Sequence, residues 1–84
     1  MNEIKLSALD RVPPSVSARV EKVGDCGHSI ASRLNVLGFK EGAEVECVGK
    51  SPLGGMRAYK VMGTVIALRD EDARCVITSY GKLT

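Results

Sequence analysis

Apolar and polar residues alternate along most of this chain, and a helical pattern replaces the alternation only once. Val16, Ala18 and Val20 fall on one face of an extended segment, because successive side chains of a strand point to opposite faces. Residues 43–48 repeat this alternation, and strand-forming patterns continue beyond them. The pattern therefore predicts a sheet whose strands each bury one face.

The helical segment lies between these two alternating stretches. Ile30, Leu34 and Leu37 are spaced at i, i+4 and i+7, which places them on one face of a helix. Ser29 is a residue type that caps helix N-termini, and Gly38 stands where a left-handed residue would end the helix. We therefore expect one short helix, capped by Ser29 and terminated at Gly38.

Turn residues divide the second half of the chain into short strands. A long loop is expected over residues 49–55, a charged turn over residues 69–72, and a bulge or sharp bend at Gly63. Further strands are expected over residues 57–62, 64–68 and 75–78. The expected fold is mainly β: a small, partly open barrel of about five strands, SH3-like or OB-like, with one short α-helix between the first and second strands.

Length and charge restrict the classes of function. A chain of 84 residues supports one core, so residues 1–84 are read as a single domain. Twelve Lys and Arg against ten Asp and Glu give a net charge of +2, which is too small to indicate nucleic-acid or membrane binding. The apolar runs are too short for membrane insertion, and three cysteines, an odd number, suit free thiols in a reducing cytoplasm.

The sequence offers weak candidates for metal binding and none for catalysis. Cys26 and His28 have a spacing at which two side chains can share a metal ion, but a structural zinc needs about four ligands. The remaining ligands would have to be Cys47, Cys75 or Asp25. The favoured interpretation is instead that Cys47 and Cys75 fill apolar core positions in strands. His28, the one imidazole, is expected in a surface turn without an acidic partner, so we expect no enzyme and no cofactor.

Two kinds of binding remain to be weighed. Stacking of nucleic-acid bases would depend on Phe39, Tyr59 and Tyr80, and Phe39 is expected in the core, which leaves a thin aromatic platform. Leu53 and Met56 are placed to contact an apolar protein partner, although they could equally close the rim of the barrel. Protein binding therefore ranks above nucleic-acid binding.

Three segments resemble the ferrous-iron transport protein A (FeoA) family. Residues 33–42, RLNVLGFKEG, resemble its Arg-Leu-x-x-Leu-Gly-hydrophobic-x-x-Gly helix and turn. Residues 51–55, SPLGG, resemble its Pro-Leu-Gly loop. Residues 63–73 resemble the segment before the last strand of the family, in which a Gly is followed a few residues later by Ala-Leu-Arg. Met56 departs from the proline that many relatives have after the loop. The resemblance runs from about Leu6 to Thr78.

The resemblance implies a stand-alone SH3-like barrel that accompanies the membrane ferrous-iron transporter in the cytoplasm, at the inner face of the membrane when bound. Leu53, Met56 and Arg57 would then form a rim that binds the GTP-hydrolysing domain or a terminal peptide of the transporter. Arg69 could contact the partner or pair with Asp70 or Asp72. The alternatives are an Fe²⁺ or Zn²⁺ carrier and a nucleic-acid-binding barrel. Self-association through an unpaired strand edge stays open.

The resembling segments also contain the expected structural residues. Leu34, Leu37 and Phe39 are expected to pack the helix and its exit onto the barrel. The expected turn glycines are Gly38, Gly42 and Gly63.

Overall fold

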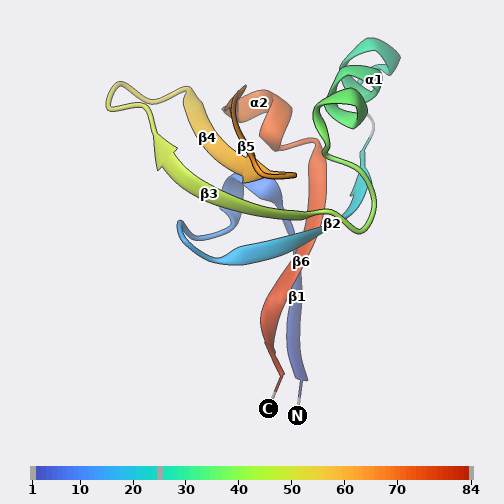
Figure 1. Ribbon diagram of the computed structural model, residues 1–84, viewed down its shortest axis with the longest axis vertical. Coiled ribbons are helices and arrows are strands. Elements are labelled where there is room, and N and C mark those ends of the chain that lie inside the picture. The colour runs from blue at the N-terminus through green and yellow to red at the C-terminus, as the bar shows by residue number, and fades with distance from the viewer. Residues whose placement is uncertain (1, 25, 84) are drawn as a thin grey trace.

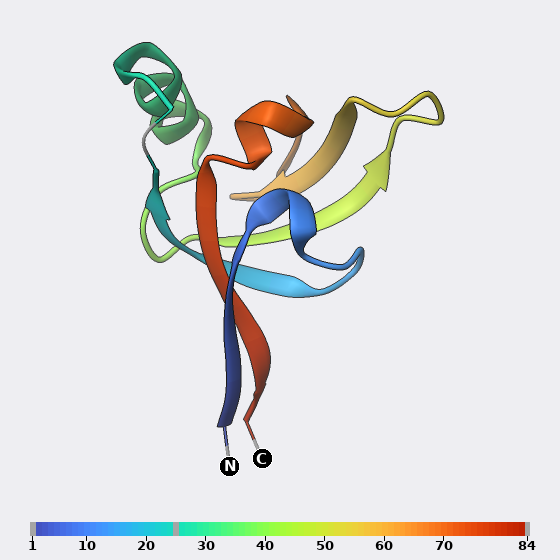
Figure 2. The same ribbon diagram turned by 180° about the vertical axis from the view of Figure 1, so that it is seen from behind.

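The computed structural model, which describes residues 2–24 and 26–83, contains one antiparallel sheet of six strands in the order β1-β6-β2-β3-β4-β5 (Figures 1 and 2). The strands are β1 (Asn2–Ala8), β2 (Ser17–Val23), β3 (Glu44–Lys50), β4 (Met56–Val61), β5 (Thr64–Arg69) and β6 (Val76–Leu83). Between them lie the 3-10 turn η1 (Leu9–Arg11), the ten-residue helix α1 (His28–Leu37) and the single-turn helix α2 (Asp70–Ala73). The sheet curves strongly and stays open, with β1 and β5 at its two edges.

The expected mainly β, partly open barrel is confirmed, and the structure adds one strand at its start. β1 pairs with β6 over the whole range from Asn2 to Ala8, so α1 follows the second strand of the chain and not the first. Ile4 and Leu6 of β1 are 53% and 74% exposed. Because this strand buries so little apolar surface, its position depends on backbone pairing with a segment far along the sequence.

The alternating segments bury the faces that the sequence predicts. Ala18 and Val20 of β2 are buried, as are Val45 and Cys47 of β3. Tyr59 of β4 is fully buried with them. The core therefore lies on the concave side of the β2–β3–β4 part of the sheet.

Helix α1 begins at His28, one residue before the expected cap. Gly27 precedes the helix, and its carbonyl accepts a hydrogen bond from the Ala31 amide at 3.0 Å. Ser29 is therefore inside the first turn, where it is exposed, and the expectation that it caps the helix was wrong. Gly27 has a φ of +93°, which glycine adopts readily and L-residues rarely do, so glycine suits the position at which the chain enters the helix.

The helix packs on the barrel through the residues that its spacing predicts. Leu34 is 2% exposed, whereas Leu37 is partly buried against the core. Phe39, just past the helix end, is fully buried, and its ring meets that of Tyr59 edge to face with centroids 6.4 Å apart. Val36, on the opposite face of the helix, is 86% exposed. Both the helix and its exit are therefore anchored in the core, by Leu34 and Phe39.

Gly38 ends α1 in the left-handed conformation that the sequence indicates. Its φ is +110°, its amide donates to the Asn35 carbonyl at 3.0 Å, and the Phe39 amide donates to the Leu34 carbonyl at 2.9 Å. A Cβ at Gly38 would lie 2.9 Å from Cγ of Met62. Glycine is therefore required here for both its backbone and its small size.

We expect Gly38→Ala to lower the free energy of unfolding by about 2 kcal/mol, since the left-handed backbone and the contact with Met62 both oppose a side chain. Gly42→Ala is the matched control: its φ is +89°, but no atom lies within 4 Å of the added Cβ. It should lose about 1 kcal/mol from the backbone alone. Urea denaturation followed by circular dichroism measures both. Equal losses would show that the contact with Met62 contributes nothing.

The bend expected at Gly63 is a two-residue hairpin turn between β4 and β5. Met62 and Gly63 both have positive φ, +51° and +76°, as a type I′ turn requires. The charged turn expected at residues 69–72 is divided between two elements: Arg69 ends β5, and Asp70, Glu71 and Asp72 form most of the single-turn helix α2. Their negative charges are favourable at the N-terminal end of a helix, where the backbone amides point outward.

Candidate functional site

The loop between β3 and β4 presents Leu53 at its tip. The Ser51 amide donates to the Met56 carbonyl at 2.9 Å, and the Gly54 amide donates to the Ser51 carbonyl at 3.0 Å. The Ser51 Oγ accepts a further hydrogen bond from the Leu53 amide at 3.3 Å. Leu53 is 98% exposed, so its alternative role in closing the barrel rim is not what the structure shows.

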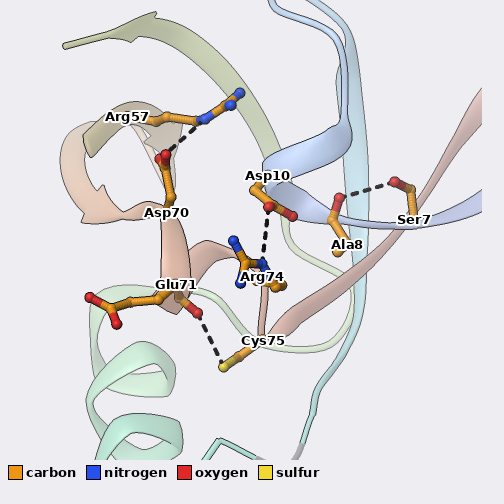
Figure 3. A network of polar contacts seen from close by, with 8 residues as sticks. All are labelled: Ser7, Ala8, Asp10, Arg57, Asp70, Glu71, Arg74 and Cys75. Carbon is orange, nitrogen blue, oxygen red and sulfur yellow. Dashed lines mark hydrogen bonds and ion pairs between the residues drawn. The ribbon is translucent and has the colours of Figure 1, made fainter. Parts of the chain in front are cut away.

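The base of this loop is held by α2. The Asp70 amide donates to the Gly55 carbonyl at 2.9 Å, and Nε of Arg57 lies 3.3 Å from Oδ1 of Asp70 (Figure 3). Both side chains are about a quarter to a third exposed, so this ion pair is partly shielded from solvent. Arg57 is therefore oriented by a contact within its own chain. Arg69, which was expected to pair with Asp70 or Asp72 or to contact a partner, is exposed.

Apolar side chains extend from the loop across the outer face of β4 and β5. Met56, next to the loop, is 40% exposed, and Val65 is 60% exposed. Between them Ala58 pairs with Ala67 across the two strands, on the face opposite to buried Tyr59. We call Leu53, Met56, Val65 and Ala67 the docking face. The loop pattern predicted Leu53 and Met56, but the two residues of β5 were not predicted, although Val65 and Ala67 alternate with half-buried Ile66 and buried Leu68.

The docking face adjoins an open edge of the sheet. Within the described ranges 2–24 and 26–83, β5 pairs with β4 only. Lys60 and Arg69 lie exposed on the same outer surface, opposite Val65 and Met56 in the strand register. This side of the molecule therefore combines exposed apolar side chains, basic side chains and unpaired backbone of an edge strand.

The aromatic side chains do not form a surface for stacking. Phe39 and Tyr59 are both fully buried, and Tyr80 is half-buried on β6. Burial raises the pKa of the Tyr59 hydroxyl far above its usual value, with a further contribution from Cys47. That hydroxyl has no hydrogen-bond partner in the described part of the chain. Tyr59, which the sequence left available for binding, is thus a core residue.

The candidate metal ligands are spread over different parts of the fold. His28 is exposed at the first turn of α1, and Cys47 is buried in β3, where its Sγ donates to the Gly49 carbonyl at 3.4 Å. Cys75 is half-buried ahead of β6 and lies near Cys26, so it does not fill the core position in a strand that was expected. Among the described residues, no group of three or more His, Cys, Asp or Glu side chains could hold a metal ion; Asp25 lies outside them.

The geometry defines a class of protein: a small SH3-like β-barrel module with an apolar, partly basic outer face and a protruding loop. Comparison with protein families then identifies the family. A model of the FeoA domain matches residues 8–79, and the chain therefore belongs to the FeoA family.

Solved structures with this fold include two relatives from iron transport. The chain is 38% identical to FeoA of Stenotrophomonas maltophilia complexed with zinc, with a TM-score of 0.73 over 93% of this chain and 88% of that one. That protein was proposed to be a bacterial ferrous iron transport activating factor. Iron(II) transport protein A of Clostridium thermocellum is 29% identical, with a TM-score of 0.80 over 87% of this chain. The match spans 44% of that protein, less than half of its length.

The fold also occurs in longer regulatory proteins. A manganese-dependent transcriptional repressor has a TM-score of 0.78 over 87% of this chain and 40% of its own, at 11% identity, which shows a common fold only. A comparison with functionally curated proteins gave no match. In the described part of the chain, no helix has the length and apolar character needed to span a membrane.

Proposed function

We propose that this chain is an accessory protein of ferrous-iron uptake that binds the cytosolic part of a membrane ferrous-iron transporter through its docking face. The observation that supports this most strongly is Leu53, which is 98% exposed on a loop held in place by hydrogen bonds within the loop and to α2. An ordered loop loses little conformational entropy on binding, and an exposed leucine at its tip gains by desolvation. Membership of the FeoA family supports iron transport as the process.

The charges around the docking face favour a partner that is apolar with acidic neighbours. Lys60 and Arg69 are exposed beside the docking face, whereas Arg57 is already paired with Asp70. A transporter segment with apolar side chains and a flanking carboxylate would contact both kinds of surface. Binding would place this protein at the cytoplasmic face of the membrane without insertion of its own chain.

The test is an NMR titration of the isotope-labelled protein with the cytosolic part of a ferrous-iron transporter. We expect the amide signals of residues 53–57 and of β5 to move with the transporter fragment, with or without metal. The titration is repeated with Fe²⁺ without oxygen, and with Zn²⁺, each in the absence of the fragment. Silence at the docking face together with strong metal-induced shifts at Cys26 and His28 would overturn the proposal in favour of a metal carrier.

A further inference from the structure

Two of the three cysteines are brought together where β2 and β6 end their pairing. The register places Val23 opposite Val76, and the next hydrogen bond runs from the Gly24 amide to the Cys75 carbonyl at 2.6 Å. The Cys26 amide donates in turn to the Gly24 carbonyl at 3.0 Å. These backbone contacts bring Cys26 and Cys75 next to each other, and the Cys26 side chain is one of the groups that raise the pKa of the Cys75 thiol.

Cys26 and Cys75 differ from the third cysteine, Cys47, in their exposure to solvent. Cys26 and Cys75 are both half-buried, whereas Cys47 is 2% exposed inside the barrel. Cys75 Sγ also donates to the Glu71 carbonyl of α2 at 3.5 Å, as Figure 3 shows. The pair is therefore accessible to a small reagent at the surface, and the third thiol is not.

The ionisation of Cys75 is opposed by its neighbours. Burial, the Cys26 side chain and the carboxylate of Asp72 raise the pKa of the Cys75 thiol to about 11, and the guanidinium of Arg74 opposes this rise. At neutral pH the Cys75 thiol is therefore protonated and a weak nucleophile. A reaction between the pair and an oxidant should then be limited by the step in which Cys75 attacks.

We propose that Cys26 and Cys75 form a reversible intramolecular disulfide by exchange with a small-molecule disulfide of the glutathione class. The Cys26 thiolate attacks one sulfur of the reagent, which forms a mixed disulfide and releases one thiolate. Cys75 then loses its proton and attacks the Cys26 sulfur, which closes the protein disulfide and releases the second thiolate. In total two protein thiols and one reagent disulfide give one protein disulfide and two reagent thiols. The product links the start of α1 to the start of β6.

The test incubates the full protein with oxidised glutathione and follows the products by mass spectrometry. We expect a product two hydrogens lighter, with a peptide that links Cys26 to Cys75, while Cys47 stays free. Since Cys75 must ionise, the rate of ring closure from the mixed disulfide should rise about tenfold from pH 8 to pH 9. Cys75→Ser should stop the reaction at a glutathione adduct on Cys26, and dithiothreitol should reverse both products.

The wild-type experiment decides the matter even where a variant folds poorly. An adduct on each cysteine without the internal link, a link between different molecules, or no reaction at all would overturn the proposal. A Cys26→Ser variant provides a second check, because it should form no internal link at either pH. The proposal is separate from transporter binding, so the two can fail independently.

Discussion

Replacement of Phe39 by alanine should lower the free energy of unfolding by about 3–5 kcal/mol, the range found for large aromatic side chains in packed cores. Phe39 is fully buried, and its ring packs edge to face on Tyr59. The truncation would leave a cavity beneath the exit of α1, at the point where the helix joins the barrel. Urea denaturation followed by far-ultraviolet circular dichroism gives the loss.

The matched control is Val36, which lies on α1, the helix that Phe39 follows. Val36 is 86% exposed, so Val36→Ala should change the free energy of unfolding by no more than about 0.5 kcal/mol. Where the alanine variant of Phe39 is too unstable to measure, Phe39→Leu should keep the fold and lose about 1–1.5 kcal/mol. A loss for Phe39→Ala no larger than that for Val36→Ala would contradict the arrangement of the core.

Replacement of Leu53 by aspartate should weaken binding to the transporter fragment between about tenfold and a hundredfold, while protein stability stays unchanged. A tenfold to hundredfold loss corresponds to about 1.4–2.7 kcal/mol of binding free energy, which is typical for the loss of a central apolar contact. The aspartate carboxylate would favour water over an apolar partner surface. Because Leu53 is 98% exposed, the same substitution removes almost no packing within the protein. Isothermal titration calorimetry measures the affinity, and urea denaturation measures the stability.

Leu6 is the control for this experiment. It is also an exposed leucine, at 74%, but it lies on β1, far from the loop that carries Leu53 (Figure 1). Leu6→Asp should leave the affinity within about twofold of the wild type. If both variants bind equally weakly, binding depends on general hydrophobicity and the docking face is assigned wrongly.

The parts of the fold that the sequence predicts are those in which local pattern and tertiary packing agree. The alternation of residues 43–48 and the helical spacing that includes Leu34 each predict a face that is buried in the structure. Strand β1 was missed because it buries little: Ile4 and Leu6 alternate with polar residues, but they face solvent. Such a strand is specified by pairing with β6, and pairing between distant segments leaves a weak signal in one sequence.

The site was harder to predict because its residues meet through tertiary structure. The loop Ser51–Gly55 could be read from its turn residues, and Leu53 and Met56 with it. The partner of Arg57 is Asp70, thirteen positions away, whereas charge spacing suggested a partner for Arg69. The proximity of Cys26 and Cys75 depends on the β2–β6 register, which could not be derived from spacing.

The pairing of β1 with β6 also decides how this module can be joined to other chains. Asn2 pairs with Leu83, so both ends of the described chain leave from one pole, and the loop that carries Leu53 lies at the other (Figure 1). A fusion at either end would extend away from the docking face. Because the two ends of the described chain lie side by side, the barrel could also be inserted into a surface loop of a host protein without separating the two ends of that loop.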